Sequence, residues 1–359
     1  MKEEFCIFFD ILGTTSNFKG IKNDEEEVKL LDRYERLMEI IRYEARKIYI
    51  SKGKIKYFSD NVFVSTPKNK LKELYNLLDF ISICQIRSIT ECNLSIRGGV
   101  AFDTIRNKDG ILMGKGLIKA HEEEGKAVYP WVKFNKETVK IYNEVLSEKR
   151  KEKASKVKGA TRKNIEKVKK VLKEEEGWTL LRIFKIRNGA FLNYLDVLKD
   201  NKDILNILKK HKEFITKELK KDLNKLNRNQ IKFIELKDQI ILKMFKYFSD
   251  EILVVQLKKN LESRNNFFER KTGTLEKIKI LESEMKALKK ERKTLRKESN
   301  QFISELKEKK YVQNKIMKVR QKYLFLAFYH NAMVEHFILE KKLRKEDREN
   351  KIDYSKLYN

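Results

Sequence analysis

The feature that most constrains this chain is an aspartate inside an apolar, aromatic-rich run. Residues 4–12 read EFCIFFDIL, and Gly13 follows them as a breaker. This pattern predicts a buried strand that ends at a turn. A carboxylate in such a strand costs free energy to bury unless a cation or strong hydrogen-bond donors meet it. The strand therefore predicts a core and, around Asp10, a polar site at its end.

The residues that follow alternate between helix-like and strand-like patterns. The order is strand, helix, hairpin, helix, strand, helix, strand, which predicts an α+β sandwich of the ferredoxin-like kind. The hairpin turns through Ser59-Asp60-Asn61, and Pro67 ends it. The expected segments after the first strand are a helix over 24–50, strands over 54–58 and 62–65, a helix over 70–90, a strand over 94–102 interrupted by Gly98-Gly99, a helix over 114–124 and a strand over 127–134.

The composition changes after Asn135. Residues 148–176 are nearly all Lys and Glu, which predicts a solvated helix or insertion, whereas 178–198 are apolar and expected to rejoin the core. Beyond residue 203 the chain has no Pro and only Gly273, and apolar residues on a 3,4 spacing near 285–302 favour a short antiparallel coiled coil. We therefore predict three parts: a domain over 1–200, a helical coiled-coil extension over 201–315, and a C-terminal helix over 316–359 that packs back on the first domain and ends in a polar tail.

The composition argues for a folded protein in the cytoplasm. Hydrophobic residues make up 41% of the 359 positions, and 21 Phe and 14 Tyr argue against disorder despite 38% charged residues. No apolar run reaches the ~18 residues of a membrane-spanning helix, and the first residues lack the pattern of a signal peptide. The cysteines are odd in number, lie in apolar stretches and form no CxxC, so they are expected to be buried reduced thiols: Cys6, Cys84 and Cys92.

The formal net charge of +29 raises the question of nucleic-acid binding. The positive charge is mostly Lys interleaved with Glu in helix-like segments, which favours solvated helix faces over a nucleic-acid site. Nucleic acid is therefore not the expected partner. Such a surface would still attract a nucleoside triphosphate electrostatically.

Asp10 and Asp60 together predict a metal site. Both would lie at neighbouring strand ends and form an oxygen-rich site that suits two Mg²⁺ or Mn²⁺ ions. Two such ions could activate a ribose hydroxyl and stabilise a pyrophosphate leaving group. Backbone N–H groups after Gly13, toward Thr14, are expected to contact phosphate oxygens. The alternative is that both aspartates are ordinary turn or cap residues.

Five motifs carry a resemblance to a known family. In chain order they are FFDILG, YFSDNVFVS, RGGVAFD, GKGLIKAHEEE and AVYP. Together they resemble the class III nucleotide cyclase homology domain, most of all the bacterial pyrimidine cyclases of Pycsar antiphage defence. The resemblance covers residues 1 to about 135, with weaker echoes at 189–195 and 322–331.

The resemblance implies a function and a set of site residues. Asp10 and Asp60 would hold the two metal ions with the backbone carbonyl of Ile11, and Lys56 would face the base. The reaction would convert a pyrimidine nucleoside triphosphate, UTP ahead of CTP, to its 3′,5′-cyclic monophosphate and pyrophosphate. The family builds this site across a homodimer, and a phage-derived activator would act through the helical extension. Lys56 is equally compatible with a solvent-facing lysine on an edge hairpin.

Departures from the family pattern leave two alternatives open. Where other class III cyclases carry an Asn and an Arg, this chain has Ile118 and Glu122, and Trp131 stands where the pyrimidine branch tends to have an Arg. Lys119 and Arg97 are the candidate replacements for phosphate charge, although Arg97 could equally be a structural arginine in a tight RGG turn. The alternatives are an inactive cyclase-fold binding module and a basic coiled-coil scaffold for nucleic acid or protein.

Other motifs are interpreted as decoys. GILMGKG (110–116) has the wrong spacing for a phosphate loop. The four histidines are scattered, and His330 is expected to be a core histidine whose hydrogen bonds are satisfied.

Overall fold

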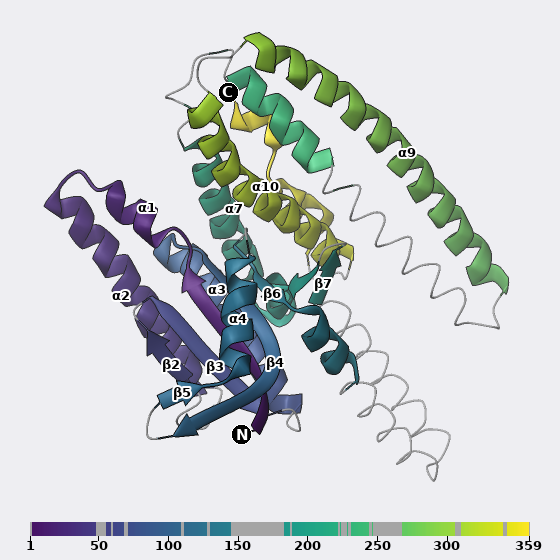
Figure 1. Cartoon of the computed structure of the whole chain (residues 1–359). Helices are drawn as coiled ribbons and strands as arrows, with labels where there is room; N and C mark the ends of the chain where they lie inside the picture. Colours follow the sequence, from purple (N-terminus) through teal and green to yellow (C-terminus); the bar gives the residue numbers. More distant parts are fainter. Residues whose placement is uncertain are drawn as a thin grey trace. The chain divides into compact units, whose positions relative to one another are not determined.

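The chain folds into two compact units, Met1–His211 and Lys212–Asn359 (Figure 1). The boundary falls inside helix α7 (Ile204–Lys220). The computed structural model describes residues 2–47, 55–58, 60–67, 71–108, 111–127, 130–144, 183–186, 189–221, 223, 228, 231–243, 246, 268–305, 310–339 and 343–358.

The first unit is built on one mixed sheet. Its strand order is β2-β3-β1-β4-β6-β8-β7, with β5 paired to β4. The pairs β1–β3, β1–β4 and β2–β3 are antiparallel, and β4–β6 is parallel. The α+β fold class is thus confirmed. The strands are β1 (Lys2–Ile11), β2 (Ile55–Phe58), β3 (Asn61–Pro67), β4 (Ile96–Lys108), β5 (Ile111–Met113), β6 (Val132–Phe134), β7 (Ile183–Ile186) and β8 (Gly189–Leu192).

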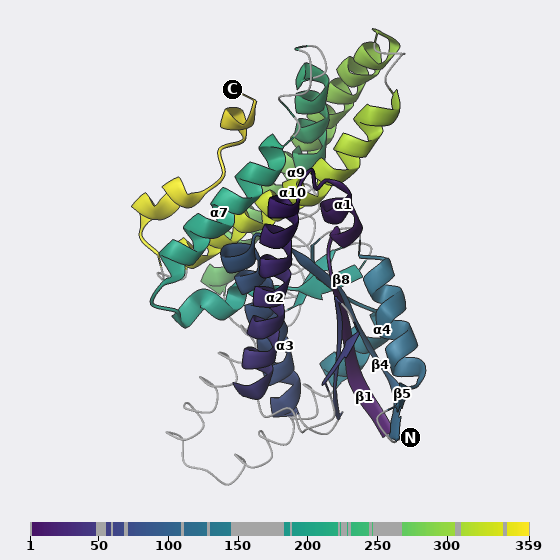
Figure 2. The same ribbon diagram turned by 90° about the vertical axis from the view of Figure 1, so that its left-hand side faces the viewer.

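Strand β1 is buried on both faces because helices cover both sides of the sheet. Cys6 and Phe8 pack in one apolar cluster with Ala120 of helix α4 (Lys115–Gly125). On the opposite face, the Phe9 ring lies 6.3 Å from the ring of Phe80 in helix α3 (Leu71–Cys92). Figure 2 shows α3 and helix α2 (Asp24–Lys47) on one side of the strands and α4 on the other. Successive side chains of a strand point to opposite faces, so Asp10 shares the α4 face with Cys6 and Phe8.

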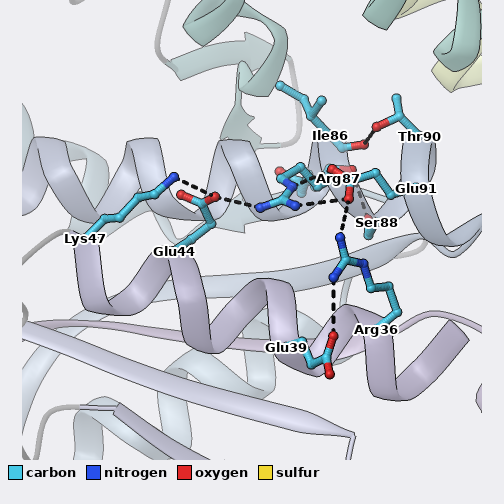
Figure 3. A network of polar contacts seen from close by, with 10 residues as sticks. Arg36, Glu39, Glu44, Lys47, Ile86, Arg87, Ser88, Thr90 and Glu91 are labelled. Carbon is cyan, nitrogen blue, oxygen red and sulfur yellow. Dashed lines mark hydrogen bonds and ion pairs between the residues drawn. The ribbon is translucent and has the colours of Figure 1, made fainter. Parts of the chain in front are cut away.

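A charged network joins α2 to α3 (Figure 3). Arg87 of α3 contacts the buried Glu44 of α2 at 2.7 Å and Glu91 at 2.5 Å. Arg36 of α2 reaches Glu91 at 3.4 Å, and Lys47 reaches Glu44 at 3.3 Å. Because each carboxylate meets two cations, the buried charge of Glu44 is compensated and the two helices are held in one register.

Glycines allow α4 to lie directly on the sheet. A Cβ atom at Gly99 of β4 would overlap the carbonyl oxygen of Ala120 and the backbone nitrogen of Glu124. Gly116, one turn before Ala120, meets the Cys6 sulfur in the same way. Helix and strand therefore approach at backbone distance, which only glycine permits.

The second unit is helical in its described part. It contains helices α9 (Phe268–Glu305) and α10 (Lys310–Leu339), the helical stretch 231–243 and the end of α7. Two 3₁₀ helices, η4 (Lys345–Asn350) and η5 (Tyr354–Leu357), follow α10. At its centre, the buried Arg320 donates to Asp238 at 2.5 Å, and the Tyr358 hydroxyl donates to the same carboxylate at 2.6 Å. Burial raises the pKa of Asp238 although Arg320 opposes the rise.

Several expectations are corrected or refined. The tight RGG turn proposed as an alternative for Arg97 is wrong, since Gly98 and Gly99 lie inside the continuous strand β4 and pair with β1. The strand expected over 127–134 is only β6, and β5 was not anticipated. Cys6, Cys84 and Cys92 are buried thiols that form no disulfide within the described residues, as expected.

Other expectations stay predictions. The charged segment 148–176 lies outside the described residues. The coiled coil within 201–315 and the packing of 316–359 on the first domain remain predictions. Among the helices that the structure describes, none combines the length and the apolar character needed to cross a bilayer.

Candidate active site

Asp10 is the next-to-last residue of β1 and lies between two other strands. In the sheet register it stands opposite Asn61 of β3 on one side and Arg97 of β4 on the other. Its side chain is 19% exposed. The apolar cluster on this face includes Cys6 and Phe8, so Asp10 lies at the rim of that cluster with its side chain mostly covered by protein.

The β2–β3 turn brings a second carboxylate beside Asp10. Asp60 immediately precedes Asn61, the register partner of Asp10, and the Asn61 amide donates to the Asp60 carboxylate at 3.2 Å. The pKa of Asp10 is raised to about 6, first by burial and then by repulsion from Asp60 and Glu124, while Arg97 and the backbone N–H of Ile11 oppose the rise. Asp10 and Asp60 therefore interact electrostatically across the strand pair.

Glu124 is a site residue that the sequence reasoning missed. It lies near the end of α4, is only 4% exposed, and contacts Arg97 with 2.5 Å between Oε1 and Nε. Arg97 also reaches Asp10, with 3.5 Å between Nη2 and Oδ2. A signal was present: Gly116, Ala120 and Glu124 recur every four residues, which places Glu124 on the buried face of a helix.

The turn after β1 is closed by its own side chain. The Thr14 hydroxyl donates to the carbonyl of Ile11 at 3.0 Å, and the Leu12 N–H donates to Ser95 at 2.8 Å. Gly13 has a φ of 88°, in the left-handed region where a side chain is unfavourable. The short helix α1 (Thr14–Lys19) starts directly after it. Ile11, Gly13 and Thr14 are therefore adjacent to Asp10 in space as well as in sequence.

Lys119 lies far from Asp10 within one chain. Its ammonium group contacts Asp103 at 2.6 Å and Glu137 at 3.3 Å. Asp103 is six residues along β4 from Arg97, the register partner of Asp10. At about 3.3 Å per residue, Asp103 and the Lys119 ammonium beside it lie roughly 20 Å from Arg97 along β4. The predicted phosphate residues thus divide into Arg97, which contacts Asp10, and Lys119, which contacts Asp103 farther along β4.

Lys56 lies on the same sheet face as Asp10, two strands away. It stands opposite Phe63 in the β2–β3 pair, and Phe63 stands opposite Phe8 of β1. Directly opposed residues share a face, so Lys56 is level with Phe8, one side-chain position inward from Asp10. Its role toward a base stays a prediction.

The positions that depart from the family pattern have distinct surroundings. Ile118 and Glu122 are exposed on α4, one turn apart, and Ile118 is 58% exposed. Trp131 is buried, and its ring stacks on Phe191 of β8 with 4.4 Å between centroids. The Trp131 side chain therefore belongs to the core of the sheet.

The donor atoms near Asp10 suit a hard divalent cation. Within the described residues no group of three or more His, Cys, Asp or Glu side chains is arranged to hold a metal. The oxygen donors that the chain itself offers are the carboxylates of Asp10 and Asp60 and the carbonyl of Ile11, a set that suits Mg²⁺ or Mn²⁺ completed by substrate phosphates. The carboxylates around Asp10 outnumber the one guanidinium, and a cation would relieve the repulsion that raises its pKa.

Comparison with known proteins gives a limited likeness. No family model matches the chain, and no curated protein matches it. Among solved structures, the adenylyl cyclase CyaB from P. aeruginosa is similar over 40% of this chain and 82% of its own, at 16% identity and a TM-score of 0.30. A bacterial light-regulated adenylyl cyclase is similar over 39% of this chain and 45% of its own, at 15% identity and a TM-score of 0.27. A likeness of this extent leaves the activity to be argued from the residues of the chain itself.

Proposed function

We propose that this chain is a metal-dependent nucleotide cyclase that converts a nucleoside triphosphate to its 3′,5′-cyclic monophosphate and pyrophosphate. The observation that carries the proposal is the pairing of Asp10 and Asp60 at neighbouring strand ends. Burial and mutual repulsion raise the pKa of Asp10 to about 6. Neighbouring carboxylates whose burial and repulsion shift a pKa in this way are typical of functional sites.

The order of the strands supports the proposal. The first four strands run β2-β3-β1-β4, all antiparallel, and the chain order is strand, helix, strand, strand, helix, strand. This order supports the ferredoxin-like arrangement that the cyclase resemblance implies. This strand order brings the end of β1 and the β2–β3 turn to the same end of the sheet, so Asp10 and Asp60 lie on neighbouring strands there.

Each nearby residue has a role in the proposed reaction. Asp10, Asp60 and the Ile11 carbonyl would hold two Mg²⁺ or Mn²⁺ ions. Such ions supply positive charge that activates the attacking hydroxyl and neutralises the leaving pyrophosphate. The ribose 3′ hydroxyl would lose its proton to solvent as its oxygen bonds to the α-phosphorus, and the bond from that phosphorus to the oxygen of the leaving pyrophosphate would break.

The phosphate groups would meet Gly13, Thr14 and Arg97. The backbone at Gly13 and Thr14 follows Asp10 directly and would contact phosphate oxygens. Arg97, held by Glu124, offers a guanidinium at the same edge and would share the phosphate charge.

The separation of Lys119 from Asp10 supports a homodimer. The separation of roughly 20 Å along β4 between Arg97 and Asp103, the contact of Lys119, favours a site in which Lys119 comes from a second copy. Two copies arranged head to tail would bring Lys119 of one to Asp10 of the other. Lys119 would then supply the phosphate charge that Ile118 and Glu122 cannot.

The base and the biological role are proposed from the motif resemblance. We favour a pyrimidine triphosphate, UTP ahead of CTP, with Lys56 near the base. The cyclic product would serve as a second messenger in antiphage defence, and a phage-derived activator would switch the enzyme on.

A second candidate function is an inactive cyclase fold that binds nucleotide without turnover. The contact between Arg97 and Asp10 favours it, because a guanidinium already occupies one side of the carboxylate. The presence of Ile118 and Glu122, where other class III cyclases have an Asn and an Arg, also favours an inactive fold.

The deciding experiment incubates the purified protein with each nucleoside triphosphate and Mn²⁺ and resolves the products by mass spectrometry. Asp60→Ala should abolish any cyclic product, whereas Asp32→Ala, at an exposed position of α2, should leave it unchanged. Nucleotide binding without a cyclic product, with phage lysate present, would favour the inactive fold.

The dimer is tested by complementation. Chains carrying Asp60→Ala and chains carrying Lys119→Ala should each be inactive alone. Mixed dimers of the two should regain about a quarter to a half of the activity, because one of the two composite sites is intact. Mixed dimers that stay inactive would contradict a site shared between copies.

A further inference from the structure

The second unit contains a cleft of about 540 Å³ with cationic walls. One wall is the face of α7 that carries Lys212, Thr216 and Lys220, spaced four residues apart and so aligned along the helix. The other wall is formed by side chains of the segment that follows α10: Arg348, Glu349, Lys351, Ile352, Asp353, Lys356 and Leu357. A volume in this range is typical of sites for small molecules.

The second wall is fixed in place by α10. The Asn331 amide donates to the Ile352 carbonyl at 3.0 Å, and the Ile352 N–H donates to the Asn331 carbonyl oxygen at 2.7 Å. His330, which is buried, contacts the Asn350 carbonyl at 2.8 Å. Because a carbonyl only accepts, His330 donates from Nε2; burial lowers its pKa to about 4, so it stays neutral. His330 is therefore the satisfied core histidine that the sequence predicts.

A contact across the cleft links its two walls. The Lys212 ammonium donates to the Glu349 carbonyl at 2.6 Å. Ile352 and Leu357 are 4% and 2% exposed and provide the apolar part of the lining. The cleft is thus built from anchored backbone, so a ligand would not have to order it.

The lining carries a surplus of positive charge. Arg348 and Lys351 share one carboxylate, Glu335, at 3.1 and 3.2 Å. Within the described residues, Lys212 and Lys220 contact no carboxylate. The lining as a whole has five cations against two carboxylates: Lys212, Lys220, Arg348, Lys351 and Lys356 against Glu349 and Asp353.

We infer that this cleft binds a small anion bearing phosphate groups, with Lys220 and Lys356 contacting it from opposite walls. Ammonium groups are strong partners for phosphate oxygens, and several converging lysines match a ligand with more than one negative charge. None of the described lining residues is aromatic, so the cleft lacks the stacking surface of a site for single-stranded nucleic acid. The lining residues belong to the second unit, whereas Asp10 and Asp60 belong to the first, and the inference does not depend on the proposed cyclase activity.

The test measures binding of sodium triphosphate and of UTP to the full-length chain by isothermal titration calorimetry. The chain carries Asp60→Ala, and EDTA is present, so that the candidate active site contributes no metal-dependent binding. Lys220→Glu and Lys356→Glu should each weaken binding about tenfold or more. Lys217→Glu is the matched control, since it changes the net charge equally from an exposed position of α7 outside the cleft.

The outcomes separate the sources of the phosphate. Equal affinities for both probes identify an inorganic polyphosphate ligand, and tighter binding of UTP identifies an organic phosphate. The inference is overturned if neither probe binds at ~150 mM salt, or if Lys217→Glu weakens binding as much as the cleft variants do. The latter result would mean that general surface charge attracts the anion.

Discussion

Arg97 is bound more closely to Glu124 than to Asp10. Its Nε lies 2.5 Å from the Glu124 carboxylate, whereas its Nη2 lies 3.5 Å from the Asp10 carboxylate. Glu124 is the more buried acid, and a buried carboxylate without a cation beside it is costly, so Arg97 compensates its charge. Glu124 thereby competes with Asp10 for the same guanidinium.

The first prediction concerns the substitution Glu124→Gln. Without the Glu124 charge, Arg97 should move onto Asp10 and compete with a metal ion for that carboxylate. The Mn²⁺ concentration needed for half-maximal binding should rise about tenfold. Direct Mn²⁺ titration followed by electron paramagnetic resonance measures this.

Glu123→Gln provides the control for that experiment. Glu123 is also buried on α4, but it contacts Lys126 and Lys133 at 2.9 and 3.4 Å. Its substitution should leave Mn²⁺ affinity within about twofold. Equal losses in both variants would show that the effect comes from disturbance of α4.

The second prediction concerns the pH dependence of metal binding. Asp10 must lose its proton to bind a cation, and its pKa is raised to about 6 by burial and by Asp60. Mn²⁺ affinity should therefore be constant above about pH 7 and fall about tenfold per pH unit below about pH 6. Calorimetric titrations between pH 5 and pH 8 measure it. An affinity that holds down to pH 5 would contradict the raised pKa.

The third prediction concerns stability in the absence of metal. The pKa of Asp10 rises from 3.8 to about 6 on folding, so the folded chain is destabilised where Asp10 is charged. That cost is absent below about pH 3.8, grows between the two values and is complete above about pH 6. At pH 7.5 the free energy of unfolding of Asp10→Asn should therefore be about 1 to 3 kcal/mol higher than that of the parent, although the variant loses the metal site. The variant should accordingly unfold at a higher urea concentration.

The gain from Asp10→Asn should shrink as the pH falls toward 4. Urea unfolding at several pH values, with EDTA present, follows it. Asp32→Asn, at an exposed position, should show no such trend. If Asp10→Asn is less stable than the parent at pH 7.5, the Arg97 contact outweighs the cost of burying Asp10.

The sequence predicted the strand that carries the site because its pattern is local. An aspartate within EFCIFFDIL, followed by a glycine, indicates a buried strand with a polar end, and Asp60 indicates a turn. The partner of Arg97 was not predicted, since Glu124 meets it only after α4 docks on β4. The RGG motif was ambiguous because glycines suit both a turn and a strand approached closely by a helix.

The last prediction tests that close approach. Gly99→Ala places a Cβ against the Ala120 carbonyl and the Glu124 nitrogen, which are backbone atoms and cannot rotate away. The helix must shift, so the variant should lose about 3 kcal/mol or more of stability, and Glu124 should release Arg97.

Gly125→Ala, where an added Cβ meets nothing within 4 Å, should stay within about 0.5 kcal/mol of the parent. Urea unfolding and Mn²⁺ titration of both variants measure these effects together. Because Gly125 directly follows Glu124 but has open space around it, loss of stability and of metal affinity in Gly99→Ala alone would tie the site to the docking of α4. Full Mn²⁺ affinity in a folded Gly99→Ala chain would instead mean that Asp10 and Asp60 bind metal without help from α4.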